Sequence, residues 1–142
     1  MPFDDLPPEQ WPQFVRLQDI PEAVEMHEGL PHPRWDIVWD HVEENVAAEE
    51  RDAAYWILVY QWLDKMASHL GGNYEIHISP NFLILAAIPD DEAMSMLRFV
   101  ERSLARIIEV LGEPQEYAVG PYVVLVFGDG DEGGLGGGNE FA

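Results

Sequence analysis

The sequence predicts a small α+β protein with N-terminal helices, a β-hairpin, a covering helix and a central strand, which form a mixed sheet with helices packed on it. Three observations support this fold class. Residues 35–70 and 90–111 repeat apolar side chains at helical spacing. Residues 74–78 alternate apolar and polar side chains, as a half-buried strand does. Residues 122–127 form an uninterrupted apolar run, which is typical of a strand covered on both faces.

The first segment, residues 1–34, is predicted to be an irregular acidic arm. It contains seven prolines, and proline both removes a backbone donor and interrupts helices. Only short helical turns fit, at residues 9–16 and 22–28. We therefore expect the arm to pack on a body formed by the rest of the chain.

Two helices are predicted after the arm. Trp35, Val38, Trp39 and Val42 share one helical face, which starts the first helix. The second helix, over residues 49–70, is apolar around most of its circumference, so it must be buried on two sides or bind a partner. Its candidate interface residues are Tyr55, Leu58 and Trp62.

The strands follow. Residues 74–78 and 82–88 are predicted to form a hairpin, and the second of these strands continues into a helix over residues 90–111. With the strand at 122–127 this makes a βαβ unit with a right-handed crossover. Residues 35–128 are thus expected to form a single α+β domain. The apolar seam of the helix is Leu97, Val100, Leu104, Ile107 and Leu111, which we expect to face the sheet.

The final segment, residues 129–142, is expected to be a flexible tail. It is rich in glycine and shows no periodicity. A phosphate loop would require Lys followed by Ser or Thr, and a calcium loop would require a fuller set of oxygen ligands, so neither is predicted.

Charge limits the partners. The chain carries 27 acidic and 7 basic residues, a net charge of −20. Such a field repels nucleic-acid phosphates and anionic membranes, so we expect neither as a partner. The alternatives are enhanced solubility, a partner with a basic face, or mimicry of nucleic acid. Because the chain has no cysteine and its first residues lack the pattern of a signal peptide, we expect a cytoplasmic location.

Three of the seven basic residues form one stripe. Arg98, Arg102 and Arg106 are four residues apart on the helix over residues 90–111. They are expected either to pair with neighbouring acids such as Glu101 and Glu109, or to dock an acidic surface.

No catalytic, metal-binding or cofactor-binding residue is predicted. The chain has no cysteine, and none of its serines lies in a GxSxG turn. His27 and His32 superficially resemble the HExxH zinc motif, but they are five residues apart and flank Gly29 and Pro31, which predicts a surface loop.

Two stretches of the sequence resemble a known family. These are YEIHISPNFLILAAIP at residues 74–89, which precedes the long helix, and YVVLVFGDGDE at residues 122–132. Together they resemble the opening segment of bacterial peptidase-MA-like proteins, which are gluzincin-type zinc metallopeptidases. In that family the HExxH helix lies further downstream. This chain contains no HExxH, so the resemblance implies the non-catalytic front part of such a domain and supplies no catalytic residue.

These observations favour a non-catalytic binding or scaffold domain that self-associates or docks another protein. The candidate interface is formed by Tyr55, Leu58, Trp62, Arg98, Arg102 and Arg106. One alternative is a fragment of a metallopeptidase-like protein that lacks its zinc site. Another is an acidic immunity protein, antitoxin or nucleic-acid mimic.

Overall fold

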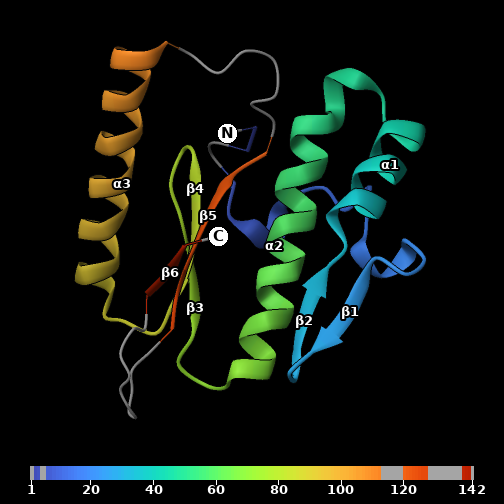
Figure 1. The fold of residues 1–142 in the computed structure, drawn as a ribbon, viewed down its shortest axis with the longest axis horizontal. Helices are drawn as coiled ribbons and strands as arrows, with labels where there is room; N and C mark the ends of the chain where they lie inside the picture. Colours follow the sequence, from blue (N-terminus) through green and yellow to red (C-terminus); the bar gives the residue numbers. More distant parts are fainter. Residues whose placement is uncertain (1, 4–5, 113–119, 128–138, 142) are drawn as a thin grey trace. The chain divides into compact units, whose positions relative to one another are not determined.

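The computed structural model describes residues 2–3, 6–112, 120–127 and 139–141 and confirms the α+β class (Figure 1). The chain divides into two compact units rather than forming the single domain expected over residues 35–128. Unit 1 comprises residues 1–71 and 119–121, and unit 2 comprises residues 72–118 and 122–142. The boundary falls where the pattern of apolar residues changes from helical to alternating, because the arm and the first two helices bury their aromatic side chains with one another.

Unit 1 contains a hairpin that the sequence did not predict. Strand β1 (Val24–His27) pairs antiparallel with β2 (Leu30–Pro33). Glu28 and Gly29 connect the strands with φ values of +56° and +83°. Positive φ values at both residues of a two-residue loop are typical of the type I′ turn, whose backbone twist matches the right-handed twist of the two strands. The hairpin replaces the helical turn expected at residues 22–28, and it contains the exposed His27 and His32 that resemble a zinc motif.

The helices of unit 1 agree closely with their predicted ranges. Helix α1 runs from Trp35 to Asn45, and α2 from Arg51 to Leu70. Unit 1 also contains three short 3-10 helices. Two lie in the arm, η1 (Pro8–Gln10) and η2 (Leu17–Asp19), and η3 (Ala48–Glu50) lies between α1 and α2. Helix α2 ends where Gly71 adopts a φ of +99°, a backbone conformation that residues other than glycine rarely adopt.

Aromatic pairs hold unit 1 together. Trp11 of the arm stacks on Phe3 with ring centroids 4.8 Å apart, and its ring edge contacts Trp56 and Tyr60 of α2. Its Nε1–H also donates to the carbonyl of Leu6. Pairs of this kind contribute about 1 kcal/mol beyond the area that they bury. The arm therefore packs into the core of unit 1 through its aromatic side chains.

Unit 2 is a four-stranded sheet with α3 on one face (Figure 1). The sheet order is β3 (Glu75–Ile78), β4 (Phe82–Ala86), β5 (Tyr122–Val126) and β6 (Asn139–Phe141). Strands β3 and β4 form the predicted antiparallel hairpin, and β4 and β5 are parallel, as the predicted βαβ unit requires. Strand β6 lies within the stretch expected to be a flexible tail; residues 128–138 and 142 of that stretch are outside the described residues.

Helix α3 (Asp90–Leu111) occupies its predicted range. Leu97 packs with Phe82, Ile84, Ala86 and Val124 of the sheet, and Val100 and Leu104 are partly buried against the same cluster. The predicted seam is wrong at its end, because the side chains of Ile107 and Leu111 are 52% and 78% exposed. Length explains the difference. A 22-residue helix spans about 33 Å, whereas the five-residue strands span about 17 Å.

None of the helices in the described ranges has an apolar stretch long enough to cross a lipid bilayer.

Candidate functional site

Helix α3 is fixed to the sheet by one carboxylate. Glu101 accepts hydrogen bonds from the Ser79 hydroxyl at 2.6 Å, from the Asn81 backbone N–H at 2.8 Å and from the Asn81 side-chain amide at 2.8 Å. Both residues that donate lie in the turn between β3 and β4. Burial raises the pKa of Glu101, but the hydrogen bonds from Asn81 and Ser79 outweigh it, and the pKa lies below its ordinary value. The bonds hold the middle of α3 against the hairpin.

The opposite side of α3 is an exposed surface of mixed character. We call it the outer face, and it consists of Phe99, Arg102, Arg106 and Val110. Phe99 and Val110 are 61% and 71% exposed, which is unusual for such large apolar side chains. Depressions run along this helix on both sides of Phe99. An apolar surface beside basic residues is typical of a protein interface, where aromatic side chains and arginine are enriched.

The arginine stripe does not form the predicted ion pairs. Within the described residues, Arg98 donates to the Ser95 hydroxyl at 3.3 Å, and Arg102 and Arg106 form neither a hydrogen bond nor an ion pair. Glu101 is the nearest acid in sequence to Arg102, but its carboxylate is engaged by the hairpin turn. Arg102 and Arg106 are exposed, and no acid in the described part of the chain engages their guanidinium groups.

The aromatic half of the predicted interface lies inside unit 1. Tyr55, Leu58 and Trp62 are each at most 6% exposed. The Trp62 Nε1–H donates to the carbonyl of Pro31 at 2.9 Å, and its ring meets Trp35 edge to face. Tyr55 stacks on Trp39 with centroids 4.7 Å apart. The two-sided apolar character of α2 is therefore satisfied within this chain, and only the arginines of the predicted interface are accessible.

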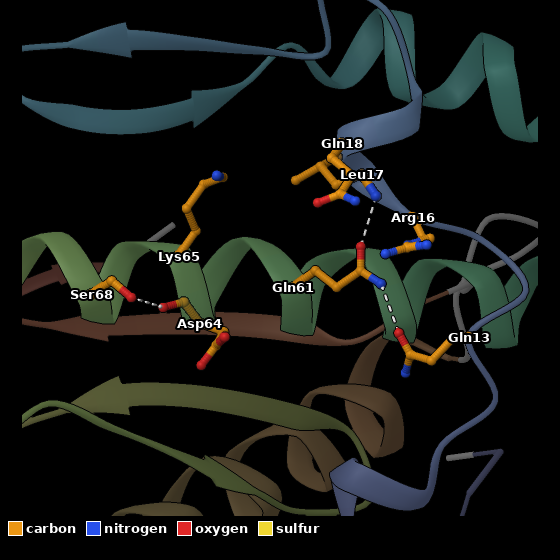
Figure 2. Close-up of a pocket in the computed structure, with 8 residues that line it drawn as sticks. All are labelled: Gln13, Arg16, Leu17, Gln18, Gln61, Asp64, Lys65 and Ser68. Atoms are coloured by element: carbon orange, nitrogen blue, oxygen red, sulfur yellow. Dashed lines mark hydrogen bonds between the residues drawn. The ribbon is translucent and has the colours of Figure 1, made fainter.

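Unit 1 also contains a polar pocket of about 370 Å³ beside α2 (Figure 2). It is lined by Gln13, Arg16, Leu17, Gln18, Gln61, Asp64, Lys65 and Ser68. Figure 2 shows the Gln61 side chain extending to the arm, where it accepts a hydrogen bond from the Leu17 N–H at 2.7 Å and donates to Gln13. It also donates to the carbonyl of Val15. The central amide of the pocket is thus used to fasten the arm, which gives this pocket a structural role.

One group of side chains in unit 2 has the composition of a metal site. Glu75, His77 and Asp90 each place a potential ligand atom within 4.8 Å of the others, and they are the one such group of three or more among the described residues. Sequence reasoning missed this group because Asp90 is thirteen residues after His77 and no motif links them. The available signal was the Glu75-x-His77 spacing, which puts two potential ligands on one face of a strand.

Comparisons of the chain with protein families, with curated proteins and with solved structures found no match. The resemblance of residues 74–128 to peptidase-MA-like proteins therefore stays a prediction.

Proposed function

We propose that this chain is a non-catalytic binding domain that self-associates through the outer face of α3. The observation that carries the proposal is the combination of exposed Phe99 and Val110 with the exposed side chains of Arg102 and Arg106, which have no partner among the described residues. Buried against a partner, the apolar side chains would contribute most of the affinity. The arginines would select an acidic surface and set the orientation.

The charge pattern of α3 favours a second copy of the same helix as the partner. Its first turn contains Asp90, Asp91 and Glu92, whereas its three arginines lie further along. Two parallel copies would place arginine beside arginine. Two antiparallel copies would place the acidic end of one helix beside the basic part of the other.

A specific register follows from the spacing. Glu92, Phe99 and Arg106 are seven residues apart, so they follow one line along the helix. A two-fold axis at Phe99 would bring the Phe99 side chains of the two chains into contact. It would also place Glu92 of each chain beside Arg106 of the other. The symmetry repeats this ion pair. Each exposed pair contributes less than about 1 kcal/mol, so the pair mainly specifies the antiparallel arrangement.

Sedimentation equilibrium over a wide range of protein concentration tests the proposal. Phe99→Asp should weaken association at least tenfold. Glu92→Arg and Arg106→Glu should each weaken it by placing like charges together, and the double variant Glu92→Arg/Arg106→Glu should restore it. Met94→Asp is the matched control, since Met94 is 50% exposed on a different side of the same helix.

Two results would reject the proposal. One is a wild-type chain that stays monomeric at the highest concentration tested. The other is an association that Phe99→Asp leaves unchanged, or that the double charge exchange fails to restore.

A further inference from the structure

We propose that Glu75, His77 and Asp90 form a binding site for one divalent transition-metal ion, for which Zn²⁺ is the ion that suits the donor set best. The site lies in unit 2, away from the outer face of α3. It is independent of the proposed self-association.

The strand register brings the three residues together. Glu75 pairs with Ala86 and His77 pairs with Ile84 across the β3–β4 hairpin. Directly opposed residues of an antiparallel pair point to the same face of the sheet. Because Ile84 and Ala86 pack in the cluster that contains Leu97 of α3, Glu75 and His77 lie on the face that α3 covers. Asp90, the first residue of α3, completes the group.

The imidazole of His77 is the second observation. Its Nε2 atom is buried and makes no hydrogen bond to any described residue. A buried polar atom without a partner costs about 1–3 kcal/mol, and such atoms are rare in native proteins. Among the described residues, Nε2 therefore lacks the hydrogen bond that a structural histidine normally makes at a buried nitrogen, as expected for an imidazole that serves as a ligand.

The donor set decides the class of ion. Imidazole nitrogen suits zinc and the neighbouring transition metals, while carboxylate oxygens are acceptable ligands for the same ions. Calcium and magnesium prefer sets made of oxygen alone. Three protein ligands leave at least one position for water or another ligand, since zinc takes four or more.

Electrostatics favours a cation here. The first turn of α3 presents a partial positive charge of about half a unit, which opposes a metal ion. The Glu75 and Asp90 carboxylates together supply two negative charges, and Asp91 and Glu92 lie in the same first turn. The carboxylates outweigh the helix dipole. The net charge of −20 raises the concentration of cations around the whole chain as well.

Isothermal titration of the full, untagged and metal-free chain with ZnCl₂ tests the site. We expect one Zn²⁺ per chain, and we expect both His77→Gln and Asp90→Asn to weaken binding at least tenfold. Asp91→Asn and His32→Gln are the matched controls, because Asp91 neighbours Asp90 on α3 and His32 belongs to the exposed hairpin of unit 1. Both controls should bind as the wild type does.

Two further measurements keep the test decisive. Circular dichroism of each metal-free variant identifies a variant that fails to fold, in which case the other variant decides. In the wild type, addition of Zn²⁺ should shift the imidazole nitrogen resonances of His77 in NMR spectra. Absence of stoichiometric binding, an unshifted His77, or binding that only His32→Gln abolishes would overturn the proposal.

Discussion

The Glu101 contact with the β3–β4 turn gives a quantitative prediction for stability. Hydrogen bonds to a charged group contribute about 1.5–3 kcal/mol each. The bond from Ser79 is partly buried, so we assign it about 1.5 kcal/mol, and the two bonds from exposed Asn81 about 0.5 kcal/mol each because water competes for them. Replacement of Glu101 by alanine should therefore destabilise the chain by about 2.5 kcal/mol, and Ser79→Ala by about 1.5 kcal/mol.

Urea unfolding followed by circular dichroism at 222 nm measures this loss. At a typical dependence of about 1–3 kcal/mol per molar urea, Glu101→Ala should lower the midpoint by roughly 0.8–2.5 M. All five tryptophans lie in unit 1, so their fluorescence reports on that unit, whereas the helical signal includes α3. Glu109→Ala removes an exposed acid from the same helix and should change stability by less than about 0.5 kcal/mol.

The pH dependence of this effect has a definite sign. The pKa of Glu101 is lower in the folded chain than its ordinary value of 4.5. Its contribution is therefore complete above that ordinary value and disappears as the pH falls through the lower folded value. The difference between the wild type and Glu101→Ala should shrink in acid. The reasoning fails if Glu101→Ala resembles Glu109→Ala at pH 7, or if the difference grows in acid.

Three substitutions in unit 1 test its core by the same unfolding assay. Trp62→Phe leaves the Pro31 carbonyl without its buried donor and should cost about 2–3 kcal/mol; a loss below 0.5 kcal/mol (roughly the scatter of surface substitutions) would contradict the role of this bond. Tyr55→Phe removes a buried hydroxyl that has no partner among the described residues, so it should be neutral or stabilising by up to about 1 kcal/mol. Burial and the nearby Glu43 raise the pKa of Tyr55 to about 12. Stability should thus decline as the pH rises from 10 towards 12 in the wild type, and less so in Tyr55→Phe; equal declines would refute this. Gly120→Ala should cost more than about 2 kcal/mol, since Gly120 has a φ of +84° and an added Cβ would lie 2.9 Å from the Tyr55 Cβ; an unchanged midpoint would show that this approach is not tight.

Sequence reasoning succeeded where a local signal marks both ends of an element. Helix α3 begins after Pro89 and ends at Gly112, and its predicted and observed ranges coincide. The β1–β2 hairpin lacked such signals. Each strand is only four residues long, the second contains prolines, and the turn depends on a left-handed Glu28, a conformation that a non-glycine residue rarely adopts.

The surface of α3 was predicted only in part. Spacing along one helix was enough to place the arginines on one face. It could not show that Ile107 would be exposed, because that depends on the lengths of strands β4 and β5 relative to the helix. Nor could it show that Glu101 would turn to the hairpin rather than to the arginines. Likewise, the grouping of His77 with Asp90 depends on the register of the sheet.

The short segment that contains Gly120 makes unit 1 discontinuous in sequence. The Gly120 N–H donates to the Asp52 carboxylate at 2.6 Å, so a stretch that follows α3 completes the unit that precedes β3. In genetic terms, unit 2 begins as an insertion within unit 1. A fragment ending at Gly71 would lack Gly120, whose N–H donates to Asp52 and which lies beside Tyr55. Isolating unit 1 would therefore require residues 119–121 as well as residues 1–71, and a linker between them would have to span about 27 Å, because Gly71 follows the C-terminal end of α2 whereas Gly120 binds Asp52 in its first turn.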